Sequence, residues 1–334
     1  MAKNTSDNQN LSAKIAEFKQ IPYRGSLLKD QNLISIHRGR ANAMLTELQE
    51  LREKVSLNPF LEIGAGCIQR SAALINNYPI DGVATDIAQQ MLQDAPYTLS
   101  LLNYKRMPML ICCDAHYLPF LSNTFMFISA FQMLHRFTDP AQVIAECYRV
   151  LGKGGYFYFN EEPVDSSLRR FLRGKRVLSR PPTKLQRLAH SLGLEKIFWD
   201  DGASERSSGI IVERFNMDLW RRALKPFTDV DIEVNRKLKI RTDLKESGLS
   251  SLLANLIGGN IKGLCLKSEG EAVSMDFRER LKCLDCGSTH LSEPEDKQLN
   301  CENCHRMYPI TDGVIRMLPK DLEIQLSQSV QASY

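Results

Sequence analysis

Two Cys-x-x-Cys pairs near the C-terminus form the most specific chemical pattern in the chain. Their thiols belong to Cys283, Cys286, Cys301 and Cys304, with fourteen residues between the pairs. Four thiolates at this spacing suit a tetrahedral structural zinc (Zn2+) with no open coordination position. We expect the metal to fold a small domain that has too little core of its own, and to take no part in catalysis. A redox site is the alternative, which the pairing of the motifs disfavours.

A second pattern consists of acids and glycines at the ends of three short apolar segments. The first segment contains Glu62 and runs into Gly64 and Gly66, and the next two end in Asp86 and Asp114. In open α/β sheets, ligands bind beyond the carboxyl ends of the strands, where glycine turns let the backbone approach them. Carboxylates there can accept hydrogen bonds from ribose hydroxyls, an adenine amine or an ammonium group. The three acids together predict a cationic nucleoside, although each alone would suit a helix cap or a solvated loop.

Two other nucleotide sites are disfavoured by the same segment. The dinucleotide fingerprint requires Gly or Ala at its sixth position, where this chain has Gln69. The chain has no Gly-Lys-Ser/Thr sequence, which excludes a P-loop. Glu62 would also repel a diphosphate on the turn, so the pattern favours a nucleoside without a phosphate chain.

The elements expected around these residues alternate between strand and helix. Buried strands are expected at 59–66, 81–87, 109–115, 125–132 and 155–162. Helices are expected at 41–54, 70–77 and 139–151, the last capped by Asp139. The alternation implies right-handed βαβ units, and therefore a doubly wound α/β fold with a mostly parallel sheet. Closing strands are expected at 229–238 and 260–267, with a helix around 245–256 between them.

In order and spacing, these motifs resemble those of class I S-adenosylmethionine-dependent methyltransferases, which have a Rossmann-like fold. The matching segments are LEIGAG, VATDI, CDAHYLPF, FISAFQMLHRF, the Asp-Pro-capped helix and LGKGGYFYFNEEP, within about residues 55–165. Among these enzymes, the motifs most resemble those of the methyltransferases of ubiquinone and menaquinone biosynthesis and related small-molecule enzymes. By this resemblance, the methionine part of S-adenosyl-L-methionine would be held by Glu62, Gly64 and Gly66. The ribose would bind Asp86, and adenine would bind Asp114 and the amide of Ala115.

Residues beyond the fourth and fifth strands are candidates for the chemistry. Methyl transfer needs mainly alignment and a dry pocket, and a general base only where the nucleophile must lose a proton. His135 resembles a catalytic histidine of related enzymes, and the alternative is a histidine that packs against the cofactor. Glu161 and Glu162 either face the acceptor or are solvated at the strand end. The segment 129–132 lacks the Asn/Asp-Pro-Pro-aromatic motif of many nitrogen methylases, which favours an oxygen or carbon acceptor.

A basic, helix-prone insertion is expected at 163–225. Between residues 166 and 194 there is no Asp or Glu, and the basic residues are Arg169, Arg170, Arg173, Lys175, Arg176, Arg180, Lys184 and Arg187. These side chains could contact RNA phosphates or an acidic small molecule. The alternative is a solvated surface, as charge runs usually are.

The segment that follows the cysteine pairs, MYPITDGVIRML, supports the zinc site by resemblance. Residues of about 280–318 resemble the small zinc-ribbon proteins that activate tRNA, rRNA and protein methyltransferases. The resemblance implies a ribbon docked in cis on the catalytic domain. We therefore expect an N-terminal segment, a methyltransferase domain, a linker, a zinc ribbon and a tail, at 1–30, 31–268, 269–279, 280–320 and 321–334.

The composition is that of a soluble globular protein, with 43% hydrophobic residues, 25% charged residues and a net charge of +4. The polar N-terminus and the lack of a long apolar run predict a cytoplasmic protein without a membrane span. The leading hypothesis is a methyltransferase for a small or carrier-bound metabolite, and the alternative is an RNA methyltransferase. Ile68, where the family usually has a third glycine, motivates a further alternative, a catalytically silent binding protein.

Overall fold

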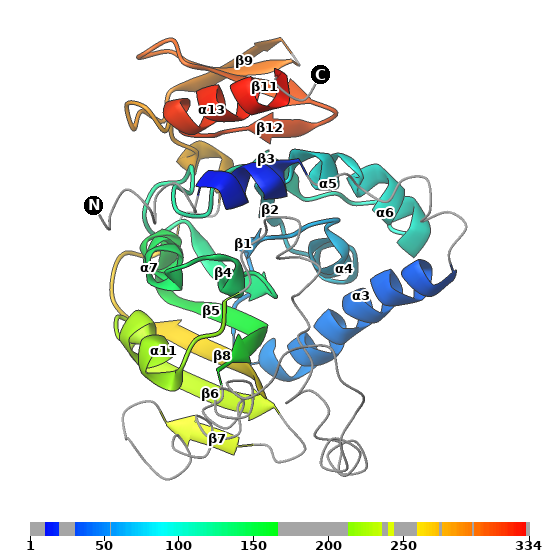
Figure 1. Cartoon of the computed structure of the whole chain (residues 1–334), viewed down its shortest axis with the longest axis vertical. Coiled ribbons are helices and arrows are strands. Elements are labelled where there is room, and N and C mark those ends of the chain that lie inside the picture. The colour runs from blue at the N-terminus through cyan, green and yellow to red at the C-terminus, as the bar shows by residue number, and fades with distance from the viewer. Residues whose placement is uncertain are drawn as a thin grey trace, which may run out of the picture.

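A computed structural model describes residues 11–19, 31–53, 55–165, 213–235, 240–243, 259–273, 276–295 and 297–331. Its strands form one twelve-stranded sheet in the order β7-β6-β8-β5-β4-β1-β2-β3-β12-β11-β10-β9. Helices cover both faces of the central strands (Figure 1). No helix within these ranges is both long enough and apolar enough to cross a bilayer.

The central strands are parallel and buried. They are β1 (Phe60–Ile63), β2 (Gly82–Asp86), β3 (Met109–Cys112), β4 (Phe125–Phe131) and β5 (Leu151–Val164). Their apolar runs match a parallel sheet that is covered on both faces. The chain moves outward from β1 to β3 and then returns to place β4 beside β1, so the carboxyl ends of β1 and β4 flank a topological switch point. The doubly wound α/β fold predicted from the sequence is confirmed.

Helices connect these strands, and the start of one of them is marked by a capping residue. They are α4 (Gln69–Asn77), α5 (Gln89–Gln93), α6 (Ala95–Leu102) and α7 (Pro140–Val150), and α3 (Gln31–Leu51) precedes the sheet. The Asp139 carboxylate accepts the N–H of Ala141 at 3.0 Å and caps α7, whose buried stripe includes Val143, Ile144 and Cys147. The helix was expected to include residue 151, but it ends at Val150, and Leu151 is the first residue of β5.

Antiparallel strands complete one side of the sheet. β8 (Gly259–Lys267) pairs with β5, β6 (Asp229–Asn235) pairs with β8, and β7 (Ile240–Asp243) forms the edge. The two closing strands are therefore present, whereas the expected helix around 245–256 lies outside the described residues, as does the basic run from Arg169 to Arg187. The end of the expected insertion forms α11 (Met217–Leu224), in which Trp220 is fully buried and stacks on Phe159.

The C-terminal strands continue the same sheet. β12 (Val314–Arg316) lies parallel to β3, and beyond it follow β11 (Met307–Thr311), β10 (Gln298–Cys301) and β9 (Leu291–Glu295). The helix α13 (Lys320–Gln331) occupies most of the expected tail and buries Leu322 and Leu326. The helix of residues 11–18 packs on the same apolar cluster through Leu11, Ile15 and Phe18 (Figure 1). The first and last helices of the described chain thus pack beside β3.

Candidate active site and cysteine cluster

A cavity of about 350 Å3 opens at the carboxyl ends of the parallel strands. Its walls include the turn after β1, the ends of β2, β3 and β4, and the helices 11–18 and α3. The volume lies at the lower end of the range for small-molecule sites. This is the place where the sequence predicted a ligand.

The turn after β1 adopts a left-handed backbone at three positions. Gly64, Gly66 and Ile68 have φ angles of 65°, 53° and 58°. A Cβ atom at Gly64 would collide with the side chain of Met133, so both the positive φ angle and the lack of space require glycine at this position. Ile68 is a fully buried β-branched residue, for which this backbone is strained by about 1–2 kcal/mol. Burial of its side chain among the apolar groups under the turn offsets that strain.

Glu62 lies beneath the turn and is 1% exposed. Its Oε2 accepts the N–H of Ser71 at 2.9 Å and the hydroxyl of the same residue. Ser71 is in the first turn of α4, so the carboxylate satisfies one of the free amides at the helix start. Burial raises the pKa of Glu62, against the lowering effects of Arg70 and Ser71. Glu62 supports the turn and is not part of the cavity wall.

Asp86 lies at the end of β2 and lines the cavity. Its two carboxylate oxygens accept the N–H groups of Gly66 and Ala88, each at 2.8 Å. Burial raises its pKa, and these hydrogen bonds oppose the rise. The carboxylate therefore links the glycine turn to the start of α5 and still faces the cavity.

Asp114 and Ala115 follow β3 and also line the cavity. Asp114 accepts the N–H of His116 at 3.0 Å and contacts Nδ1 of its ring at 2.7 Å. Lys14, from the helix of residues 11–18, places its Nζ 2.5 Å from the other carboxylate oxygen. Burial alone would raise the pKa of Asp114, but His116 and Lys14 outweigh it and bring the pKa to about 2.

His135 and Glu162 form a buried pair away from the cavity wall. Glu162 is fully buried and accepts the N–H groups of Met133, Leu134 and His135 at 2.7–3.0 Å. The same carboxylate lies 2.8 Å from Nδ1 of His135, which is 7% exposed. Glu162 thus holds the short 3-10 turn of Leu134–Arg136; it is buried and is not part of the cavity wall. Glu161 instead faces Arg70, at 3.5 Å.

Polar side chains that no sequence motif predicted as site residues enter the cavity from α3 and α4. His37 and Arg40 line it from α3, and Gln69 and Arg70 line it from α4. His37 and Gln69 are joined by a hydrogen bond between Nδ1 and Nε2. Burial, and then the charge of Arg40, lowers the pKa of His37. His37 lies seven residues before the buried Met44, on the same helix face, and this polar position in an apolar stripe was the available clue.

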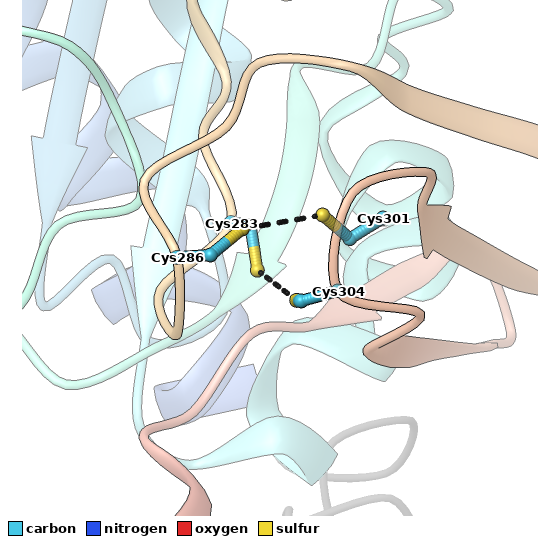
Figure 2. Close-up of side chains that lie close together, drawn as sticks. All are labelled: Cys283, Cys286, Cys301 and Cys304. Carbon is cyan, nitrogen blue, oxygen red and sulfur yellow. Dashed lines mark hydrogen bonds between the residues drawn. The ribbon is translucent and has the colours of Figure 1, made fainter.

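The four C-terminal cysteines meet at one point (Figure 2). All four sulfur atoms lie within 4.8 Å of one another, and the pairs Cys283–Cys304 and Cys286–Cys301 are each 3.5 Å apart. The edge of a tetrahedron with metal–sulfur bonds of about 2.3 Å is roughly 3.8 Å long, so the donor set fits a four-coordinate metal. Tyr308 is fully buried beside it, and its hydroxyl accepts the N–H of Leu284 at 2.8 Å and lies 3.2 Å from the sulfur of Cys283.

Residues 61–159 match the family of the methyltransferase domain. Residues 61–159 are therefore a methyltransferase domain, which confirms the S-adenosylmethionine-dependent methyltransferase expected from the sequence. No curated protein matches the chain.

This methyltransferase is similar to several solved structures. A complex between a methyltransferase activator and a methyltransferase from Haloferax volcanii has 13% identity and a TM-score of 0.42, over 70% of this chain and 95% of that chain. A methyltransferase from Thermotoga maritima has 17% identity and a TM-score of 0.39, over 77% and 100% of the two chains. A phosphoethanolamine N-methyltransferase from Haemonchus contortus has 13% identity and a TM-score of 0.45, over 75% and 62%. Because these likenesses are weak, the assignment depends on the domain match.

Proposed function

We propose that the cavity binds S-adenosyl-L-methionine along the ends of β1, β2 and β3. Gly64 and Gly66 would hold the methionine part, with Glu62 supporting the turn from below. Asp86 would accept from the ribose hydroxyls, and Asp114 and the Ala115 amide would contact adenine. The observation that carries this proposal is that Asp86 and Asp114 face one cavity from adjacent strand ends. The bound cofactor supplies an electrophilic methyl group on a sulfonium, and the chain aligns the acceptor and keeps water out.

For the acceptor we propose a small or carrier-bound metabolite that is methylated at oxygen or carbon. The cavity is small and is covered by the helix of residues 11–18 and by α3, which favours a compact acceptor over a nucleotide within a folded RNA. Phe131 and Gln132 occupy the end of β4 where a planar-amine motif would lie, which disfavours nitrogen.

An extract assay tests this acceptor class. The purified chain would be incubated with methyl-labelled cofactor and with the small-molecule and RNA fractions of cells that lack this gene. We expect label in the small-molecule fraction. Label in RNA alone, with binding that weakens steeply as salt rises and depends on Arg169 to Arg187, would instead establish the RNA methyltransferase.

For the cysteine cluster we propose one structural Zn2+ in a ribbon that supports the catalytic domain in cis. The four-sulfur donor set and the hydrogen bond from Tyr308 suit a closed site of this kind. The pairing of β12 with β3, next to Asp114, is the contact through which the ribbon would support the cofactor site. A chelator should release about one zinc per chain and unfold the ribbon, and an unchanged C-terminal unit after metal removal would refute the structural role.

A further inference from the structure

The cavity has a basic end that the roles proposed above leave unused. Arg70 lines it from α4, and its guanidinium lies 4.1 Å from the ring centroid of Phe131 at the end of β4. The same guanidinium lies 3.5 Å from Glu161 in β5. Because β4 and β5 lie on one side of β1 and β3 lies on the other, this end is remote from Asp114. Arg40 lines the same end from α3.

The charges at this end are incompletely balanced. The negative charges of Glu62 and Glu161 offset the positive charge of Arg70, whereas the positive charge of Arg40 repels it. In the part of the chain that the structure describes, no acidic side chain pairs with Arg40. His37, beside Arg40, has a lowered pKa and so remains neutral at pH 7. Among the described residues, the Arg40 guanidinium therefore lines the cavity without a counter-ion of its own.

Two distorted strand ends shape this part of the cavity. The register between β5 and β8 shifts between Phe159 and Glu162, and Glu161 has a φ angle of 63°. Gln132, at the end of β4, has a φ angle of 52° and donates its N–H to the carbonyl of Asn160 at 3.2 Å. Bulges and left-handed non-glycine residues concentrate where a side chain must be aimed at a ligand. Here they bring Glu161 to Arg70 and Gln132 into the cavity wall.

We propose that Arg40 and Arg70 bind a carboxylate or a phosphate at this end of the cavity, beside His37. Guanidinium groups suit both anions because their forked N–H donors can bind two oxygens at once. The inference rests on the proposed function and extends it to the chemistry of the ligand. The anion has two sources, the α-carboxylate of the cofactor or an acidic acceptor. The position of Arg70 over the ends of β4 and β5 favours the acceptor.

The test compares Arg40→Gln with Arg38→Gln in the full chain. Both residues are exposed on α3 and both changes remove one positive charge, but Arg38 does not line the cavity. Calorimetry would measure the binding of S-adenosylhomocysteine, which carries the α-carboxylate, and of 5′-methylthioadenosine, which lacks it. NMR of histidine-labelled chain would follow the His37 ring during titration with inorganic phosphate, with and without S-adenosylhomocysteine.

A loss of about tenfold or more in affinity for S-adenosylhomocysteine alone, in Arg40→Gln only, would assign the anion site to the cofactor carboxylate. Unchanged nucleoside binding, with a phosphate-induced shift of the His37 resonance that Arg40→Gln abolishes, would assign the site to an acidic acceptor. Equal effects of the two variants, or no effect in either experiment, would overturn the anion site. If neither nucleoside binds, the cofactor role fails, and the phosphate titration of the free chain still decides the anion site.

Discussion

The Nζ atom of Lys14 lies 2.5 Å from Oδ2 of Asp114, so the helix of residues 11–18 contacts the end of β3 at the cavity wall. The lysine side chain is 19% exposed and the carboxylate is 2% exposed. The other oxygen of Asp114 is held by His116. Adenine and Lys14 would therefore compete for the same carboxylate oxygen.

Replacing Lys14 should strengthen cofactor binding. In Lys14→Met the competing cation is absent, and we expect the affinity for S-adenosylhomocysteine to rise about two- to fivefold in calorimetry. Lys19→Met is the matched control, because Lys19 is exposed on the same segment and does not line the cavity. A weaker affinity in Lys14→Met would show that this lysine contacts the ligand instead of competing with it.

The low pKa of Asp114 predicts a pH-dependent contribution to stability. A carboxyl group with a pKa of about 2 in the folded chain, and about 3.9 when unfolded, stabilises the fold above pH 4 and loses this effect as the pH falls toward 2. Asp114→Asn should therefore be less stable than the native chain at pH 7, and the difference should be about half as large at pH 3. Urea unfolding at both pH values measures it. A difference that is constant or grows on acidification would contradict the account.

The glycine turn offers a matched pair of substitutions. Both Gly64 and Gly66 have positive φ angles, but a Cβ at Gly64 collides with Met133, whereas a Cβ at Gly66 has no atom within 4 Å. Gly64→Ala should lower the free energy of unfolding by about 2–4 kcal/mol, and Gly66→Ala by about 1 kcal/mol. Urea denaturation distinguishes them, and equal losses would mean that the contact with Met133 has no energetic effect.

Substitutions in the buried pair of His135 and Glu162 distinguish a structural role of His135 from a catalytic one. Since His135 is not in the cavity wall, His135→Ala should retain label transfer within a few-fold in the extract assay. Glu162→Ala leaves three backbone N–H groups without their acceptor and should lower the free energy of unfolding by about 2–4 kcal/mol. A fall of 100-fold or more in His135→Ala, with unchanged folding, would instead identify a general base.

The strand ends were predictable from sequence because they combine local features. Asp86 and Asp114 each end a short apolar run, and parallel strands place such ends on one edge of a sheet. The α7 helix was predictable because Asp139 and Pro140 mark its start and an apolar stripe follows.

The partners of these residues depend on tertiary contacts that no local pattern contains. Lys14 contacts Asp114, which lies 100 residues later in the sequence, and Arg70 contacts Glu161, which lies 91 residues later. Glu62 looks like a ligand residue in sequence, yet burial and Ser71 commit it to the start of α4. His135 lies between Met133 and Arg136, which line the cavity, but the buried carboxylate of Glu162 holds its ring away from the cavity wall.

Calorimetric titration of the full chain and of Asp86→Ala with S-adenosylhomocysteine tests whether the cavity binds the cofactor through Asp86. Asp81→Ala is the control, since Asp81 is an exposed acid that precedes the same strand and pairs with Arg106. We expect one site per chain in the native protein and in Asp81→Ala, and an affinity at least about tenfold lower in Asp86→Ala. An absence of binding to the native chain, or equal binding to Asp86→Ala, would contradict this expectation.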